Sequence, residues 1–231
     1  MIAVAAVFGT QLRSAQAGVA PTAAPATAAA VVSDVVVTGA AADLPEHGRG
    51  PVVPASALTG FALPEGYDVP DDPDLLPNSP REYRGGYHEG VDFPLSHSMP
   101  VVAAKAGVVI RIDTSYVEWS AEEQILAEDE GYRLGYTPER TLDKLRGRQV
   151  WIDHGNGVVT RYAHLESVEP ISVGSLVGQG TLIGHVGNSG TKAGPHLHIE
   201  IRVGEGYLGE GLTGDALLRV LHRAFSVGPA Q

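Results

Sequence analysis

The run at positions 195–203 constrains the fold most, because polar and apolar residues alternate along it. In a β-strand, side chains two positions apart lie on the same face. One face carries His196, His198, Glu200 and Arg202. The other carries Leu197, Ile199, Ile201 and Val203. This pattern predicts a strand with one face in the core. Its two histidines either bind a metal together, divide metal binding and proton transfer between them, or are ordinary polar side chains.

A second polar pair, His88 and Asp92, lies much earlier in the chain. In an extended strand, residues four apart are separated by about 13 Å, which is too far for both to bind one zinc ion with bonds of about 2 Å. We therefore expect the backbone to bend at Gly90, because glycine bends at the lowest cost. Together with one strand histidine, the pair would form a two-histidine, one-carboxylate set with a fourth position open, as in catalytic zinc sites.

Seven segments, in order, resemble the lysostaphin-type (LytM-like) zinc metalloendopeptidases that cut peptidoglycan cross-bridges. They are residues 88–92, 100–109, 150–157, 162–165, 173–180, 187–190 and 194–198. The second of these segments, residues 100–109, resembles the hairpin that follows the first metal motif in this family. The chain departs from the family at Ala193, where a small hydroxyl residue is common, and in a long insertion at residues 114–148. Because the family has only a short loop at this place, the resemblance does not predict the shape of the substrate groove.

The resemblance implies a role for each matched residue. His88, Asp92 and His198 would bind one zinc ion, and His164 and His196 would be the catalytic pair beside it. The sequence does not assign the separate roles of the pair. Our hypothesis is that His196 is the general base and that His164 hydrogen-bonds to the oxyanion.

The implied function is a zinc-dependent endopeptidase that hydrolyses peptide bonds in peptidoglycan stem peptides or cross-bridges with a metal-activated water. One alternative is a non-catalytic or regulatory LytM-like domain that controls another cell-wall hydrolase, for which a regulatory protein partner would be required. A second alternative is a biotinyl- or lipoyl-type carrier modified at Lys105, but it leaves the histidines unexplained.

Composition supports a mainly β fold. The chain has 29 glycines and 16 prolines in 231 residues, which suits short strands joined by tight turns. We expect an antiparallel sheet domain, barrel- or sandwich-like, with a short two-helix insertion and a C-terminal helix. Cysteine is absent, which rules out disulfides and thiolate zinc ligands. The net charge of −11 argues against nucleic-acid binding.

The chain is expected to divide into five parts. These are an apolar N-terminal segment (1–17), an Ala/Pro-rich linker (18–34), an extended Pro-rich arm (35–80), the zinc metallopeptidase domain (81–205) and a C-terminal helix and tail (206–231). The first segment resembles a truncated signal peptide or anchor and is too short to span a bilayer. We therefore expect an extracytoplasmic protein of the cell envelope, periplasmic or secreted, which a longer native N-terminus would anchor to the membrane.

The insertion carries its own helix signals. Ser120 and Glu123 form a capping box for a first helix, which we expect to end at Gly131. Thr137 and Pro138 predict the start of a second helix that stops near Gly147. These helices would either restrict access to the zinc or cover an exposed sheet edge. A third helix is expected at residues 215–225.

Overall fold

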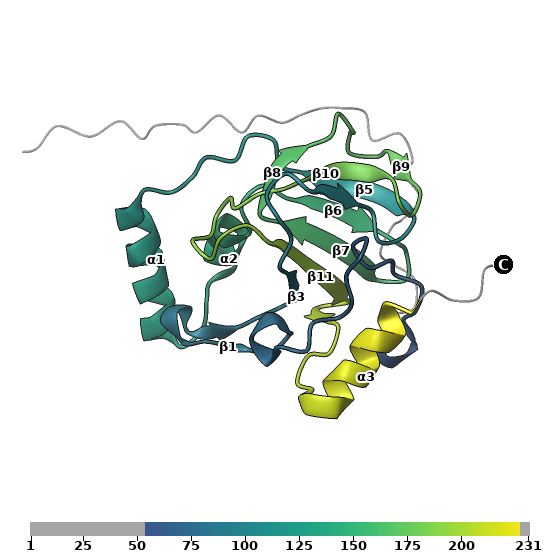
Figure 1. Ribbon diagram of the computed structural model, residues 1–231. Coiled ribbons are helices and arrows are strands. Elements are labelled where there is room, and N and C mark those ends of the chain that lie inside the picture. Colours follow the sequence, from purple (N-terminus) through teal and green to yellow (C-terminus); the bar gives the residue numbers. More distant parts are fainter. Residues whose placement is uncertain (1–53, 227–231) are drawn as a thin grey trace, which may run out of the picture. The chain divides into compact units, whose positions relative to one another are not determined.

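The predicted strand of alternating residues lies inside the largest sheet. The computed structural model describes residues 54–226 (Figure 1). The largest sheet has the order β12 (Gly206–Tyr207), β11 (Leu197–Val203), β7 (Val158–Ala163), β6 (Val150–Asp153), β5 (Gly107–Ile112) and β9 (Leu176–Val177), and β3 (Val91–Phe93) also pairs with β11. All its pairings are antiparallel. The mainly antiparallel fold predicted from the sequence is confirmed.

A second sheet contains β4 (Pro100–Val102), β10 (Leu182–Val186) and β8 (Leu165–Val168), in the order β4-β10-β8. The expected hairpin at residues 100–109 is wrong, because β4 pairs with β10 whereas β5 pairs with β6 and β9. The chain between them changes sheets. Lys105, in this connection, donates to the carbonyl of Thr59 and lies over the Phe61 ring, so it is not a free lysine at a hairpin tip.

One hydrophobic core joins both sheets. Val109 and Ile152 enter it from the large sheet, and Leu165 and Ile183 enter it from the second sheet. The described part of the arm also contributes to this core, through Leu58, Phe61, Val69 and Leu76. Residues 54–80 of the arm are therefore built into the packing of the β-structure rather than laid over its surface.

The insertion lies between β5 and β6 and forms two helices, α1 (Ala121–Leu134) and α2 (Glu139–Arg146). The capping box of Ser120 and Glu123 is confirmed. The expected end at Gly131 is wrong: α1 continues to Leu134 and ends at Gly135, which adopts a left-handed conformation (φ 74°). Figure 1 shows α1 standing apart from the strands.

Gly131 is needed inside α1 because the helix comes very close to another segment there. A Cβ atom at this position would lie 2.4 Å from the carbonyl oxygen of Arg84, in the 3-10 helix Glu82–Arg84. Thr137 is not the cap of α2, whose preceding residue is Pro138. Instead, the Thr137 hydroxyl donates to the Arg84 carbonyl and accepts from the Arg84 guanidinium.

The C-terminal helix α3 (Gly214–Ala224) is confirmed within one residue of its predicted bounds. Leu217, Leu221 and Phe225 form a buried apolar stripe along and just after this helix, and His222 is exposed. The short strands β1 (Pro80–Arg81) and β2 (Gly86–Tyr87) pair with each other beside the 3-10 helix Glu82–Arg84. Among the described residues, no helix is long and apolar enough to cross a bilayer.

Candidate metal centre

Strands β3 and β11 bring the three predicted ligands together. Their antiparallel register places His198 directly opposite Asp92, and His88 lies just before β3. The Nδ1 of His198 is 2.7 Å from Oδ1 of Asp92 and 3.0 Å from Nε2 of His88. Nε2 of His88 is 3.1 Å from the same Asp92 oxygen. Three potential ligand atoms therefore meet at one point.

Gly90 permits this convergence, and the backbone bends there as expected. A Cβ atom at Gly90 would lie 2.5 Å from the carbonyl oxygen of Ile199 and 2.8 Å from Cε1 of His198. The glycine is thus required by the close approach of two chain segments as well as by the bend. Any larger residue would separate His88 from His198.

Hydrogen bonds orient both ligand histidines. Nδ1 of His88 donates to the carbonyl of Leu76 at 2.9 Å, which leaves Nε2 as a free lone pair. Nε2 of His198 lies 3.4 Å from Oε1 of Glu200, at the long end of hydrogen-bonding distance, and directs Nδ1 toward Asp92. Fixing the tautomer of a ligand histidine through its outer nitrogen is a general feature of metal sites.

The donor set fits a zinc ion. Tetrahedral zinc with bonds of about 2 Å separates its ligand atoms by roughly 3.3 Å, and the three distances here are 2.7, 3.0 and 3.1 Å. Metal binding requires both of these ring nitrogens to be unprotonated, and their lone pairs then face each other at 3.0 Å, a repulsion that a cation between them would relieve. Nitrogen and carboxylate oxygen are ligands that zinc accepts.

The pKa values show the same preference for positive charge. Burial alone would lower the pKa of His198, but the carboxylates of Asp92 and Glu200 raise it to about 9. Burial would raise the pKa of Asp92, yet His88 and His198 hold it well below its usual value. Asp92 and Glu200 therefore favour positive charge at this buried position, whether a protonated His198 or a bound cation carries it.

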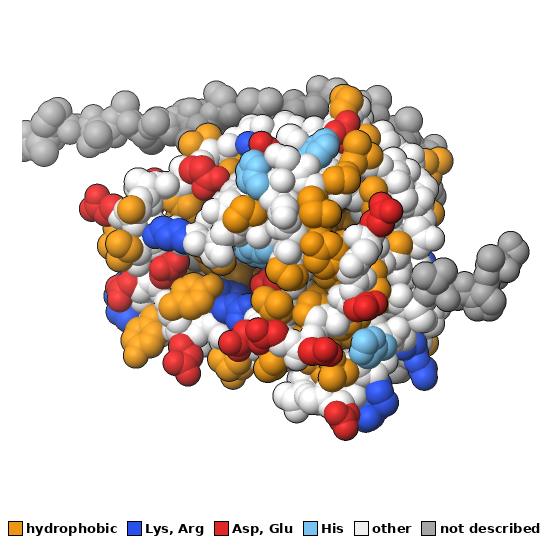
Figure 2. Space-filling model, viewed as in Figure 1, with side chains coloured by type: hydrophobic (Ala, Val, Ile, Leu, Met, Phe, Trp, Pro, Cys, Tyr) orange, Lys and Arg blue, Asp and Glu red, His pale blue; other side chains and the backbone are white. Residues whose placement is uncertain are grey.

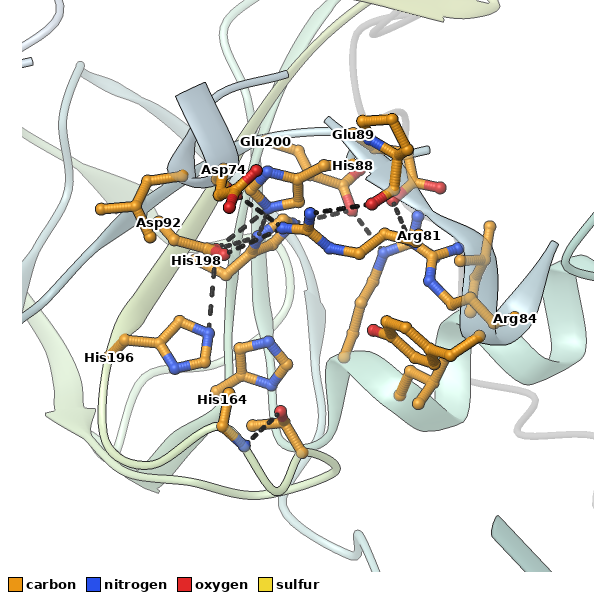
Figure 3. A pocket seen from close by; sticks show the side chains of 18 residues that line it. Asp74, Arg81, Arg84, His88, Glu89, Asp92, His164, His196, His198 and Glu200 are labelled. Carbon is orange, nitrogen blue, oxygen red and sulfur yellow. Dashed lines mark hydrogen bonds and ion pairs between the residues drawn. The ribbon is translucent and has the colours of Figure 1, made fainter. Parts of the chain in front are cut away.

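The other two predicted residues, His164 and His196, lie beside this cluster (Figure 3). Their ring centroids are 4.6 Å apart, and the His164 ring is 5.7 Å from that of His198. Nε2 of His196 is 3.7 Å from Oδ1 of Asp92. The structure therefore places all five predicted residues in one site.

His164 occupies the point where the chain passes from one sheet to the other. It follows β7, precedes β8 and has a left-handed backbone (φ 60°), a conformation uncommon outside glycine and concentrated at functional sites. Its Nδ1 donates to the carbonyl of Ser189, and Nδ1 of His196 donates to the carbonyl of Gly194. In the neutral state both rings thus present an unprotonated Nε2.

Burial lowers the pKa of His164 to about 3, and the neighbouring His196 and His198 add to the shift. His164 is therefore neutral at ordinary pH, and its Nε2 is a proton acceptor. A role in hydrogen-bonding to an oxyanion requires His164 to gain a proton during the reaction. Because the neutral rings of His164 and His196 both offer an unprotonated Nε2, their tautomers do not show which of them is the general base.

A cleft of about 420 Å³ opens over the five residues. Leu142, Leu145 and Arg146 of helix α2 line it, whereas no lining residue comes from α1 in the part of the chain described. Arg81 and Tyr83 line it from the segment before the first ligand. In Figure 2, acidic, basic and hydrophobic side chains are interspersed over this face, with no large patch of one charge.

Sequence reasoning placed no function on Glu200 or Arg146, both of which are buried beside the ligands. Glu200 was recognised as part of the polar strand face, but its burial had no local signal. The other histidines lie elsewhere. His154 is held by Ala106 and Thr160, His97 is near Glu166, His185 is near Ser167, and His47 lies outside the described residues.

Known proteins are similar to this region. Residues 86–209 match peptidase family M23. Over 116 residues the chain is 33% identical to the DD-carboxypeptidase/endopeptidase Mpg of Neisseria meningitidis serogroup B and 31% identical to the peptidoglycan DD-endopeptidase ShyA of Vibrio cholerae. Each match covers 50% of this chain but only 20% of the relative.

Among solved structures, the catalytic domain of the antimicrobial peptidase lysostaphin from Staphylococcus simulans is 23% identical. That comparison covers 63% of this chain and 78% of the lysostaphin domain, with a TM-score of 0.37.

Proposed function

Because the chain belongs to peptidase family M23, we propose that it is a zinc-dependent endopeptidase that hydrolyses peptide bonds in peptidoglycan stem peptides or cross-bridges. The observation that carries the proposal is the convergence of His88, Asp92 and His198, with His164 and His196 beside them. One relative is named as the DD-carboxypeptidase/endopeptidase Mpg and another as the peptidoglycan DD-endopeptidase ShyA. We accordingly propose DD-endopeptidase activity as the first to be tested.

In this proposal, His88, Asp92 and His198 hold one zinc ion. When bound, zinc acts as a Lewis acid and lowers the pKa of water. His196 accepts a proton at Nε2, which faces the cleft because Nδ1 is held by Gly194. His164 is the proposed oxyanion partner, and it donates at Nε2 only when protonated, because Nδ1 already donates to Ser189.

The cleft supports a peptide substrate of the cell wall. It is open to solvent, lined by apolar and charged side chains, and bounded on one side by α2. We propose that residues 81–205 form the catalytic domain, that the protein acts outside the cytoplasm, and that α2 restricts which peptides reach the site. A regulatory protein partner remains part of the alternative function only.

The test is digestion of purified peptidoglycan by the full chain, with zinc and after removal of zinc by a chelator, followed by mass analysis of the fragments. We expect zinc-dependent cleavage of cross-linked peptides, and no cleavage by a His198→Ala control. Protein that binds zinc at this site but cleaves no peptidoglycan of any cross-bridge type would contradict the proposal and favour the regulatory alternative.

A further inference from the structure

Glu200 is a fully buried carboxylate two residues after the ligand His198. A buried carboxylate is costly unless opposite charges and hydrogen bonds compensate it. Its carboxylate oxygens lie within ion-pair distance of Arg146, Arg161 and Arg202. Glu200 is therefore held as an anion behind the metal centre.

The main compensating charge comes from the insertion. Nε of Arg146, in the last turn of α2, lies 2.5 Å from Oε1 of Glu200. Two cations of the sheet are more distant from the other carboxylate oxygen, Arg161 at 3.3 Å and Arg202 at 3.6 Å. Arg146 is itself buried, and its Nη1 donates to Glu139 at 3.0 Å. The guanidinium thus ties the insertion to strand β11.

The same oxygen of Glu200 faces the metal centre. Oε1, which accepts from Arg146, lies 3.4 Å from Nε2 of His198. The opposite nitrogen of that ring, Nδ1, lies in the three-residue cluster. A carboxylate behind a metal-binding histidine orients the ring and increases its basicity. The contacts therefore run without a gap from α2 through Glu200 to His198; Figure 3 labels Glu200 and His198 in the cleft.

We propose that Arg146 is a positioning residue of the metal centre, which acts by holding Glu200 against the outer nitrogen of His198. This inference rests on the proposed metal site. It means that the insertion is part of the support of a ligand and not only a wall of the cleft, although Arg146 lies 54 positions before Glu200 in the sequence. α2 is then required for zinc binding as well as for substrate choice.

The test measures zinc affinity by competition with a chromophoric chelator, using the full chain and its Arg146→Met variant. Loss of a residue that supports a metal ligand from the outer shell typically weakens metal binding about 10–100-fold, and we expect a weakening in this range. At saturating zinc, kcat on a peptidoglycan peptide falls while KM stays within about twofold. Arg146→Lys, which keeps the charge, recovers part of both losses.

The matched control is Arg140→Gln, in the same helix. Arg140 is exposed, and its ion pair with Glu130 lies within the insertion. Its removal should leave zinc affinity unchanged. Equal losses in both variants would show that any charge change in α2 disturbs the site, and would overturn the specific role of Arg146.

Arg146→Met removes the nearest cation from a buried carboxylate, leaves only the more distant Arg161 and Arg202 beside it, and so threatens folding. The double variant Arg146→Met/Glu200→Gln removes both charges. If Arg146 serves only to balance charge, the double variant regains both thermal stability and native zinc affinity. In our proposal, the double variant regains thermal stability, but its zinc affinity stays at least about tenfold weaker than that of the native protein. The proposal is overturned if the double variant binds zinc with native affinity. It is also overturned if the zinc affinity of the Arg146→Met variant lies within twofold of the native value.

Zinc affinity is measured without substrate, so this result is independent of the proposed enzyme activity. A protein that binds zinc in an Arg146-dependent way but cuts no peptidoglycan would retain the inference and refute the function.

Discussion

The two walls of the cleft are built differently. On the sheet wall, every candidate ligand or catalytic side chain has a polar partner that fixes its orientation, such as Leu76 for His88 and Ser189 for His164. The insertion wall is α2, whereas α1 lines none of the cleft among the described residues and exposes Ile125, Leu126 and Tyr132 to solvent. The difference indicates that the proposed chemistry belongs to the sheet, and that α2 supports it through the contact of Arg146 with Glu200.

The largest expected effect is on the sheet wall. His88→Ala removes one of three zinc ligands, so zinc affinity and peptidoglycan cleavage should both fall by more than the roughly 10–100-fold that outer-shell changes cause. Zinc content after dialysis and fragment release measure the two effects. His97→Ala, an exposed histidine outside the site, is the control. Retention of zinc in His88→Ala would remove this residue from the proposed ligand set.

His164→Ala and His196→Ala should separate catalysis from metal binding. Each should lower kcat by about 10²–10⁴-fold, the usual contribution of general acid–base catalysis. Zinc content should remain near native, because neither ring belongs to the cluster of ligand atoms. Loss of zinc from His196→Ala would instead make His196 a ligand.

In the insertion, away from the cleft, Gly131→Ala should detach α1 from the 3-10 helix Glu82–Arg84. In an exposed helix this change stabilises by up to about 1 kcal/mol. Here the new Cβ would lie 2.4 Å from a backbone oxygen, so we expect a net destabilisation of about 1–3 kcal/mol. Denaturant unfolding measures it, and the exposed Leu126→Ala is the control, with a change within about 0.5 kcal/mol.

The same Gly131→Ala variant sharpens the comparison between the two walls. Because α1 does not line the cleft in the described residues, kcat on a short peptide should change by less than about twofold while stability falls. A large loss of kcat would show that α1 supports the catalytic site.

The smallest effect is expected where α2 meets β5. Burial would raise the pKa of Asp143, but its ion pair with Arg111 outweighs burial and lowers it. A lowered carboxyl pKa contributes stability above the unfolded value near 3.8, and this contribution is lost as the pH falls through the folded pKa. Because both side chains are about one-third exposed, the contribution should stay below about 1 kcal/mol.

This prediction is tested by unfolding the native protein and Asp143→Asn at pH 7 and at pH 3. The native protein should be the more stable at pH 7, and the difference should shrink at pH 3. A difference that grows at pH 3 would mean that Asp143 is not stabilised as an anion.

Much of the site could be predicted because its signals are local. The alternation of polar and apolar residues at positions 195–203, most of which form β11, predicts His196, His198 and Glu200 on one face, and Ser120 with Glu123 predicts the start of α1. The expected end of α1 at Gly131 failed because that glycine serves a tertiary contact. The expected hairpin at residues 100–109 failed because strand pairing depends on partners far along the chain.

By itself, the sequence determined which residues can bind a metal and the local strand and helix patterns that carry them, because spacing and side-chain chemistry are properties of short segments. Only the tertiary structure decided that Arg146 reaches Glu200, that Leu76 holds His88, and that the arm enters the core. These contacts join residues from separate segments, and burial, which makes them strong, exists only after the chain has folded.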